Sequence, residues 1–564
     1  MTNHRRLFAL LATLALPVPV WAQADAGAYL AGRQAGSQND FAAATTYFTK
    51  ALKGDPTNPA LLESTLIGQI GLGRFDLAQA FAQTMVDQGI ASQTAHIALT
   101  VAAGQAGAWD DILVALEAGQ TVGPLADGLS QAWALVGQGQ MTEALSAFDA
   151  VISAEGLKAF GLYHKALALA VVGDYEGADA ILSMTPSQGL PRTRRGAFAH
   201  AQILSQLGRN ADALTMLDTV FGSDPDPSLA QLRDRLGAGD TVPFTQVTDA
   251  RTGLAEVYFS IAVALDGDAD DAYTLIYARA AEALNPTSTG IILETAGLLD
   301  RIGRYDMASA TYAKVTPDDP AFYAAEMGRA DVLRKDGKLD TAIEVLQQLV
   351  RSNGNLPLVQ ATLGDLLRQN EDFTGANVAY TAALDLMADD DPAAWFVHYT
   401  RGITNERLKQ WPEAEADLRA ALALNPGQPS VLNYLGYSMV ERQVNLDEAL
   451  AMIEQAVAAQ PDSGAIVDSL GWVLYRLGRY DEAVGQMEKA ASLEATDPVV
   501  NDHLGDVYWA VGRKTEARFQ WQRALSFNPE PAEAERIRAK LNKGLDAVLA
   551  DEGAAPLRVA RDDR

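Results

Sequence analysis

Residues 464–498 have the sequence GAIVDSLGWVLYRLGRYDEAVGQMEKAASLEATDP, and this stretch decides the fold. A Leu-Gly pair at Leu470 and Gly471 is followed by an alanine, Ala483, twelve residues after the glycine. The same arrangement recurs on both sides at steps of 35 and 34 residues, which indicates a repeated structural unit. The three copies are Leu435-Gly436 with Ala449, Leu470-Gly471 with Ala483, and Leu504-Gly505 with Ala517.

Small residues at these positions predict close packing between two helices. Two antiparallel helices joined by a short turn approach closely only where the crossing point carries Gly or Ala. In the turn, Gly478 supplies the left-handed conformation that ends the first helix, and we expect Asp481 to cap the second. Each pair alone leaves an apolar face uncovered, which the next pair covers. The sequence therefore predicts an all-α array of stacked helix pairs.

The pattern extends upstream through most of the chain. The step from Gly364 to Gly402 is four residues too long, because the acidic insertion at 388–392 lengthens one turn. Between Leu66 and Ala132 there is room for one poorly marked unit. The small residues and their alanines are Gly402 with Ala414, Gly364 with Ala376, Ala330 with Ala342, Ala296 with Ala308, Ala262 alone, Ala201 with Ala213, Ala166 with Ala178, Ala132 with Ala144, Leu66 with Ala78, and Gly32 with Ala44.

The phase of the repeat breaks between Ala201 and Ala262. Prolines and glycines gather in a polar setting at 222–250, so we expect an irregular hinge or linker there, or an irregular unit. After the last repeat we expect a solvating cap helix and a loose tail. The predicted domains are a leader at 1–22, a degenerate array at 23–221, the linker at 222–250, a regular array at 251–530, and the cap helix with its tail at 531–564.

The repeated unit resembles the tetratricopeptide repeat (TPR) family, whose pattern is W-x2-L-G-x2-Y followed by A-x3-F, A and P. The resemblance covers most of residues 27–530. It implies a TPR-type α-solenoid, a right-handed superhelix of antiparallel helix pairs with about 12–14 repeats. It also implies an inner groove, lined by the first helix of each pair, that binds other proteins or peptides.

The family grips its ligands from a stripe of positions around the small residue of the first helix. Aromatic and Arg side chains grouped on an exposed face are typical of protein-binding hot spots. The alternative is that Trp472 and Trp509 pack between neighbouring helices. Asp468 and Asp502 stand where peptide-carboxylate-binding members carry Lys, Arg and Asn, which disfavours an acidic tail as the ligand. The predicted groove residues are Asn433, Tyr437, Asp468, Trp472, Tyr475, Arg476, Asp502, Asp506 and Trp509.

The amino terminus predicts secretion. Arg5 and Arg6 precede a short apolar stretch from Leu7 to Leu16, and cleavage after Ala22 fits the small-residue rule for a signal peptide. The apolar stretch is too short to span a bilayer, although an uncleaved anchor is the alternative. The chain has no Cys, so we expect neither lipidation nor disulfides. We therefore expect a periplasmic protein with no integral membrane segment in its mature form.

Charge and motifs exclude several classes of function. A net charge of −28 and a pI of about 4.6 disfavour nucleic acid as a partner. Acidic and basic residues are interspersed, as on a solvated surface. The six His residues lack the i, i+4 pairing of a helical zinc site, and no phosphate loop or nucleophile elbow occurs. We therefore expect no metal, no cofactor and no enzyme activity.

Three hypotheses for the function remain. The leading one is a non-catalytic envelope adaptor, because the chain resembles repeat proteins that deliver cell-wall hydrolases to carboxy-terminal processing proteases. Its partners would be an envelope protease or a murein hydrolase, brought together at high effective concentration. The second is a component of an export, pilus or outer-membrane assembly machine. The third is an unrecognised hydrolase built on Asp468, Asp502 and Asp506. Self-association stays open.

Overall fold

The computed structural model describes residues 25–222, 226–554, 556 and 557. The predicted leader at 1–22 lies outside the described residues, as do residues 223–225 of the predicted linker and 558–564 of the predicted tail. The described residues form α-helices and one short 3-10 turn at Pro186–Gln188, with no strand among them. The helices divide into two compact units, one ending at Val345 and the other beginning at Leu346.

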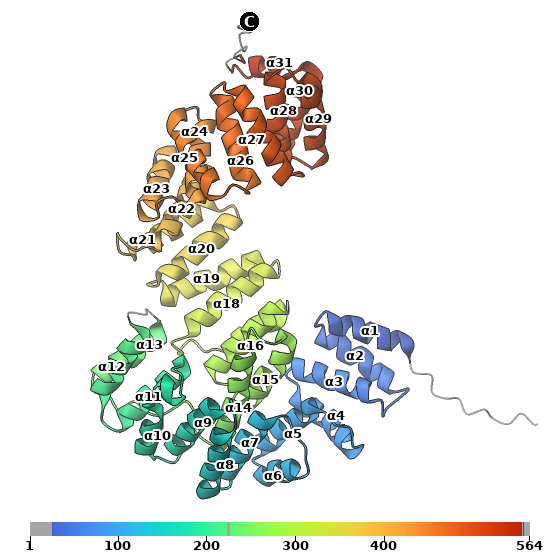
Figure 1. Ribbon diagram of the computed structural model, residues 1–564, viewed down its shortest axis with the longest axis vertical. Coiled ribbons are helices and arrows are strands. Elements are labelled where there is room, and N and C mark those ends of the chain that lie inside the picture. The colour runs from blue at the N-terminus through green and yellow to red at the C-terminus, as the bar shows by residue number, and fades with distance from the viewer. Residues whose placement is uncertain (1–24, 223–225, 555, 558–564) are drawn as a thin grey trace, which may run out of the picture. The chain divides into compact units, whose positions relative to one another are not determined.

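Unit 1 contains the degenerate repeats and residues 251–345 of the predicted regular array (Figure 1). Its helices α1 to α12 form six successive pairs, which include the poorly marked unit as α5 and α6. The helices are α1 (Ala26–Ser37), α2 (Phe41–Leu52), α3 (Pro59–Gly71), α4 (Phe75–Asp87), α5 (Gln93–Ala106), α6 (Trp109–Glu117), α7 (Pro124–Gly137), α8 (Met141–Ser153), α9 (Lys158–Val171), α10 (Tyr175–Leu182), α11 (Arg194–Gln206), α12 (Asn210–Phe221), α13 (Pro227–Gly237), α14 (Ala250–Leu265), α15 (Asp271–Leu284), α16 (Thr289–Arg301), α17 (Tyr305–Tyr312) and α18 (Phe322–Lys335).

Unit 2 contains the regular repeats and the end of the described chain. Helix α19 (Leu339–Asn353) contains the boundary between the units. None of the helices in the described ranges is long and apolar enough to cross a membrane. The helices of unit 2 are α20 (Pro357–Gln369), α21 (Phe373–Asp385), α22 (Ala394–Arg407), α23 (Trp411–Leu424), α24 (Pro429–Glu441), α25 (Leu446–Ala459), α26 (Gly464–Arg476), α27 (Tyr480–Leu493), α28 (Pro498–Ala510), α29 (Lys514–Ser526), α30 (Pro531–Lys543) and α31 (Leu545–Asp551).

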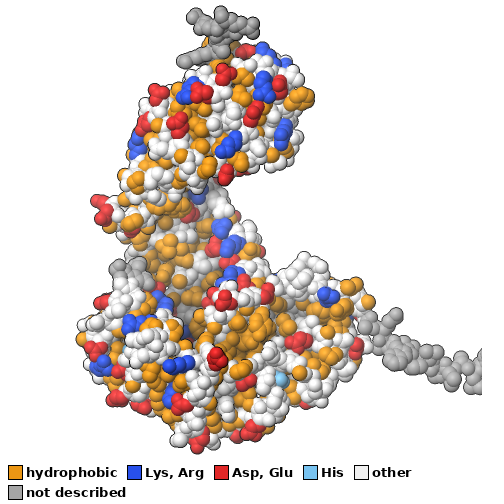
Figure 2. Space-filling model, viewed as in Figure 1, with side chains coloured by type: hydrophobic (Ala, Val, Ile, Leu, Met, Phe, Trp, Pro, Cys, Tyr) orange, Lys and Arg blue, Asp and Glu red, His pale blue; other side chains and the backbone are white. Residues whose placement is uncertain are grey.

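The small residues of the repeat do what the sequence predicts, and the α-solenoid is confirmed. A Cβ atom at Gly436 would lie 2.8 Å from Cγ1 of Ile453 on the partner helix. Added Cβ atoms at Gly471 and Gly505 would collide with Met487 and Trp521 in the same way. Close packing of this kind leaves no room for a larger residue at the crossing point. Figure 2 also shows acidic and basic side chains interspersed on the visible face of each unit.

The turn between α26 and α27 is predicted correctly in one part and wrongly in another. Gly478 adopts the left-handed conformation, with a φ of 78°. The prediction that Asp481 caps the next helix is wrong, because the N-cap position belongs to Arg479 and Asp481 lies in the first turn. There its carboxylate still faces the positive end of the helix dipole.

Residues 226–249 are more ordered than the predicted irregular linker. Pro227–Gly237 form α13, whose apolar side chains pack against α12. The extended stretch that follows is tied to α11 by five hydrogen bonds, three of which show the pattern. Val242 N donates to Ser205 Oγ at 2.9 Å, Gln206 Nε2 donates to Val242 O at 2.6 Å, and Thr245 N donates to Gln202 Oε1 at 3.0 Å. The division into compact units falls in α19 instead of at this stretch.

Helices α14 and α15 fill the inner face of the amino-terminal repeats. The first helices of four successive pairs, α3, α5, α7 and α9, all contact α14 or α15 (Figure 1). Arg279 donates to the carbonyl of Gly71 at 3.2 Å, and Gln105 donates to the carbonyl of Ala283 at 2.8 Å. Leu254 packs so closely on α5 that a Cβ at Gly104 would lie 2.7 Å from it. This part of the inner face is therefore core and not a free groove.

A test of this packing is available at Gly253 on α14. A Cβ atom added there would overlap the buried ring of Trp133 on α7. We expect Gly253→Ala to lower the free energy of unfolding of unit 1 by about 1–3 kcal/mol, because overpacking forces helices apart. Urea unfolding followed by circular dichroism measures this loss.

The matched control is Gly297→Ala on α16, where an added Cβ meets no atom within 4 Å. Alanine in the middle of a helix should raise the free energy of unfolding there by about 0.5–1 kcal/mol. Equal effects of the two substitutions would contradict the close approach of α14 to α7.

Candidate functional site

The predicted groove residues lie on the first helices of three successive pairs in unit 2. Asn433 and Tyr437 belong to α24, the next four to α26, and the last three to α28. The prediction that they form an exposed face is wrong for five of them, which are buried. These five are Asp468, Trp472, Tyr475, Asp506 and Trp509.

The aromatic residues of the predicted groove are buried because they pack against neighbouring rings and against helix α31. The Trp472 ring lies 3.9 Å from the His503 ring and 4.8 Å from the Tyr475 ring, nearly parallel to both. Its Nε1 donates to Glu441 at 2.6 Å. Trp509 donates to Asp546 of α31 at 2.9 Å. Both tryptophans therefore pack between helices, which was the alternative to a role as exposed groove residues.

The acidic residues of the predicted groove hold a helix of the same chain. Lys540 of α30 is fully buried, and its Nζ lies 2.8 Å from Asp502 and 2.7 Å from Asp506. Arg536, one turn earlier on α30, lies 3.6 Å from Asp506. Burial and the nearby charge of Asp506 raise the pKa of Asp502, against the opposing effect of Lys540. The expected solvating cap helix is thus anchored by buried ion pairs, which sequence analysis missed although Arg536 and Lys540 share the i, i+4 spacing of one helix face.

Behind this cluster, His503 forms an ion pair with Asp468 at 2.9 Å. Burial alone would lower the pKa of His503, but the charge and hydrogen bond of Asp468 outweigh burial and raise the pKa above 6.5. Asp502 and Asp506 act in the same direction.

This raised pKa predicts a pH dependence for unit 2. The stabilisation from protonated His503 is complete below pH 6.5 and is lost as the pH rises through the higher pKa of the folded state. We expect the free energy of unfolding to fall over that window, and His503→Gln to remove this part of the fall. Urea unfolding between pH 6 and pH 9, measured on both proteins, tests the expectation. A slope unchanged in His503→Gln would contradict it.

One part of the repeat face in unit 2 stays open. We call it the open face. It consists of five residues that lie six or three positions before, or one position after, the small residue of their helix, which is Gly364 in α20, Gly402 in α22 and Gly436 in α24. Leu358 is 61% exposed and Phe396 is 45% exposed. The side-chain Oδ1 of Asn433 is buried and accepts no hydrogen bond from the described residues. The open face is Leu358, Phe396, Tyr399, Asn433 and Tyr437.

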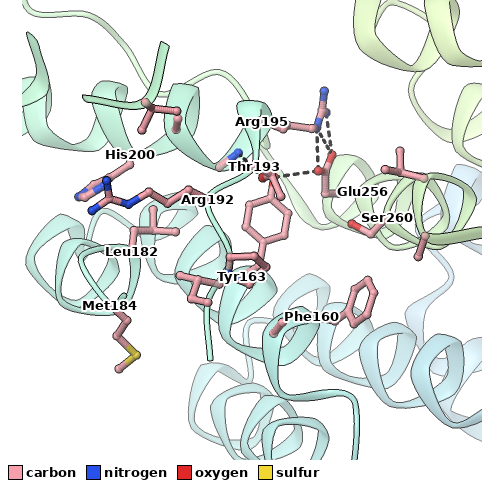
Figure 3. A pocket seen from close by; sticks show the side chains of 18 of the residues that line it. Phe160, Tyr163, Leu182, Met184, Arg192, Thr193, Arg195, His200, Glu256 and Ser260 are labelled. Carbon is pink, nitrogen blue, oxygen red and sulfur yellow. Dashed lines mark hydrogen bonds and ion pairs between the residues drawn. The ribbon is translucent and has the colours of Figure 1, made fainter. Parts of the chain in front are cut away.

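Unit 1 contains a pocket of about 490 Å³ next to the filled inner face. Helices α9, α11, α12 and α14 and the connection between α10 and α11 form its walls (Figure 3). Most of the lining is apolar, and cavities of about 300–1,000 Å³ with such linings are typical of small-molecule sites. The apolar lining residues include Phe160, Leu182, Met184, Leu190, Met216, Val220, Phe259 and Val263.

A buried ion pair crosses one wall of the pocket. Arg195 Nε donates to both oxygens of Glu256, at 2.7 and 2.9 Å, and Nη2 donates at 2.6 Å. The Tyr163 hydroxyl donates to the same carboxylate at 2.9 Å (Figure 3). Burial and the charge of Glu256 raise the pKa of Tyr163 well above its usual value. The tyrosine is therefore a neutral donor, and the wall is electrically balanced. No cluster of His, Asp and Glu suited to a metal occurs among the residues that the structure describes.

The comparisons with known proteins match a family model, curated relatives and solved structures. The family model of the tetratricopeptide repeat matches residues 129–186, 293–357, 362–429 and 441–498. A TPR repeat-containing protein of Pseudomonas aeruginosa is 32% identical over 172 residues, covering 30% of this chain and 28% of that protein. Protein FlbA of Caulobacter vibrioides is 27% identical over 246 residues, 43% of this chain and 40% of its own length.

A third relative is cellulose synthase operon protein C of Pseudomonas fluorescens, 28% identical over 160 residues, which are 27% of this chain and 12% of that protein. The chain thus spans less than half the length of each of these relatives. Among solved structures, a tetratricopeptide repeat protein from Parabacteroides merdae is 16% identical with a TM-score of 0.34, covering 51% of this chain and 97% of that one.

Proposed function

Because this chain is a tetratricopeptide repeat protein, we propose that it is a non-catalytic scaffold that binds other proteins through the open face of unit 2. Stacked repeats present long faces of side chains, and such faces suit protein ligands more than small substrates. Most of this face is already occupied within the chain, by α14 and α15 in unit 1 and by α30 in unit 2. The open face is the part of the unit 2 face that keeps large apolar side chains exposed.

The observation that carries the proposal is the exposure of large apolar side chains on the open face. Leu358 and Phe396 occupy the same position in successive repeats, and they are 61% and 45% exposed. Tyr399 lies beside Phe396, with ring centres 6.5 Å apart. Exposed aromatic and aliphatic side chains in one row are typical of protein-binding sites.

The role that we favour is an adaptor of the bacterial cell envelope. It would hold a processing protease or a cell-wall enzyme beside its substrate and so raise the effective concentration of the substrate, without catalysing a reaction itself. The expected secretory leader supports a periplasmic location for this scaffold. The alternative is a component of an envelope assembly machine, and the similarity to a protein of a cellulose synthase operon favours it.

The hydrolase hypothesis rested on a cluster of free carboxylates. Asp468 is paired with His503, and Asp502 and Asp506 are both paired with Lys540. Carboxylates that neutralise a buried cation hold a helix in place, and they are not available to activate water. The geometry therefore supports a scaffold over a hydrolase.

Site-specific photo-crosslinking in cells tests the proposal. A photo-reactive phenylalanine replaces Phe396 on the open face, and the same residue replaces Val378 as the control. Val378 is 66% exposed but lies on α21, the second helix of its pair. We expect a discrete crosslinked protein from position 396 and none from position 378. Leu358→Asp should abolish the crosslink, because it places a charge in the apolar row.

The identity of the crosslinked protein separates the roles. A processing protease or murein hydrolase would support the adaptor, and subunits of an envelope machine would support the assembly component. A second copy of this chain would indicate self-association. Crosslinks of equal yield and identity from both positions would contradict the open face as the binding site.

A further inference from the structure

The pocket of unit 1 is the part of the inner face that α14 leaves uncovered. Helices α9 and α11, the first helices of their pairs, line it together with the last turns of α14. Val263 on α14 is 49% exposed and lines this pocket, so its mouth carries apolar surface without a partner. The remaining volume of about 490 Å³ suits a compact ligand and not a long peptide.

The polar side chains of the lining favour a ligand that needs few hydrogen bonds. Glu256 is satisfied by Arg195 and Tyr163, as described above. His200 Nε2 lies 2.7 Å from Asp179, to which the Ser183 hydroxyl also donates. The Ser260 hydroxyl lies 3.3 Å from His164, and the Thr193 hydroxyl accepts from Gly196 N at 3.0 Å. An extended peptide would bring unpaired amides to these walls, which is costly, whereas an aliphatic chain would not.

Arg192 is the exception among these polar residues. It lines the pocket, and the structure of the described residues records no ion pair or hydrogen bond for its guanidinium. Its neighbours Arg194 and Arg195 are already paired with Asp226 and Glu256. Figure 3 shows Arg192 beside His200, at the side of the pocket opposite the Glu256 wall. Because Arg192 lines the pocket and keeps its guanidinium unpaired among the described residues, it can contact an anionic head group.

We propose that the pocket binds a free long-chain carboxylate, with its aliphatic tail between α9, α11 and α14 and its carboxylate on Arg192. This site goes beyond the proposed protein-binding function and is independent of it, since the open face lies in unit 2. The apolar walls supply the affinity through buried area, and Arg192 supplies the preference for an anionic head group.

Isothermal titration calorimetry with dodecanoate, at concentrations below micelle formation, tests the proposal. Dodecyltrimethylammonium has a tail of the same length and the opposite head-group charge. We expect saturable binding of one dodecanoate per chain and weaker binding of the cation. Arg192→Gln should weaken dodecanoate binding about fivefold, the contribution of a well-exposed ion pair. Arg251→Gln is the control, because Arg251 is an exposed arginine on α14 that does not line the pocket.

A second pair of variants tests the tail site. Ala264 lines the pocket near the end of α14 and is exposed, so Ala264→Trp should fill the mouth without disturbing the fold. We expect it to abolish binding of both detergents, while Val114→Trp on the exposed side of α6 leaves binding unchanged. The proposal is overturned if dodecanoate shows no saturable binding, or if it binds equally well to Ala264→Trp. Equal effects of Arg192→Gln on both detergents would overturn the assignment of the head group.

Discussion

Lys540→Met should lower the free energy of unfolding of unit 2 by about 3–5 kcal/mol, because breaking a buried ion pair leaves its partner's charge uncompensated. Lys540 is fully buried and forms ion pairs with both Asp502 and Asp506. Methionine keeps most of the side-chain volume, so the loss reports charge and not packing. The loss should shrink at low pH, where protonation of Asp502, whose pKa is raised, removes one uncompensated charge.

The matched control is Lys543→Met, three residues later on the same helix. Lys543 pairs with Asp551 at the surface, and both side chains are well exposed. Surface pairs contribute about 0–1 kcal/mol, so the control should lose little. Urea unfolding gives the free energies, and hydrogen exchange of α30 shows whether this helix detaches first. Similar losses in the two variants would contradict the anchoring of α30 by buried charge.

The fold of the regular repeats could be predicted because one local rule generates it. Small residues such as Gly436 and Gly471 mark each helix crossing, and the spacing between them gives the length of the unit. Even the degenerate pair α5 and α6 follows from the size of the gap. The rule describes neighbouring pairs only. It carries no information about contacts between distant repeats, so the docking of α14 and α15 on α3 to α9 could not be predicted.

The candidate site shows the same division. The repeat register placed the nine predicted residues correctly on successive first helices. Whether a position on that face is open depends on what the rest of the chain lays over it. Asp502 and Trp509 contact α30 and α31, whereas Phe396 stays 45% exposed. The pocket could not be predicted from the sequence either, because its walls come from segments up to about a hundred residues apart.

Trp133→Ala should lower the free energy of unfolding of unit 1 by about 3–5 kcal/mol, because it leaves a cavity in the core. Trp133 is fully buried between α7 and α14, and its ring meets Phe148 edge to face at 5.8 Å. Its Nε1 donates to His164 Nδ1 at 3.1 Å. Trp133→Phe keeps an aromatic ring but leaves the Nδ1 atom of His164 without a hydrogen-bond donor. We expect it to lower the free energy of unfolding by about 1–3 kcal/mol.

Hydrogen exchange of peptides from α7 and α14 measures whether the substitution also loosens the packing of α14 on the inner face. In Trp133→Ala the exchange of α14 should rise together with that of α7, because the two helices pack directly against each other around Trp133. The control is Trp109→Ala, where a half-buried tryptophan packs on Gly137 within the α6 and α7 contact. Its loss should leave α14 protected. Protection of α14 in both variants would show that α14 is held independently of α7, and it would contradict their shared packing.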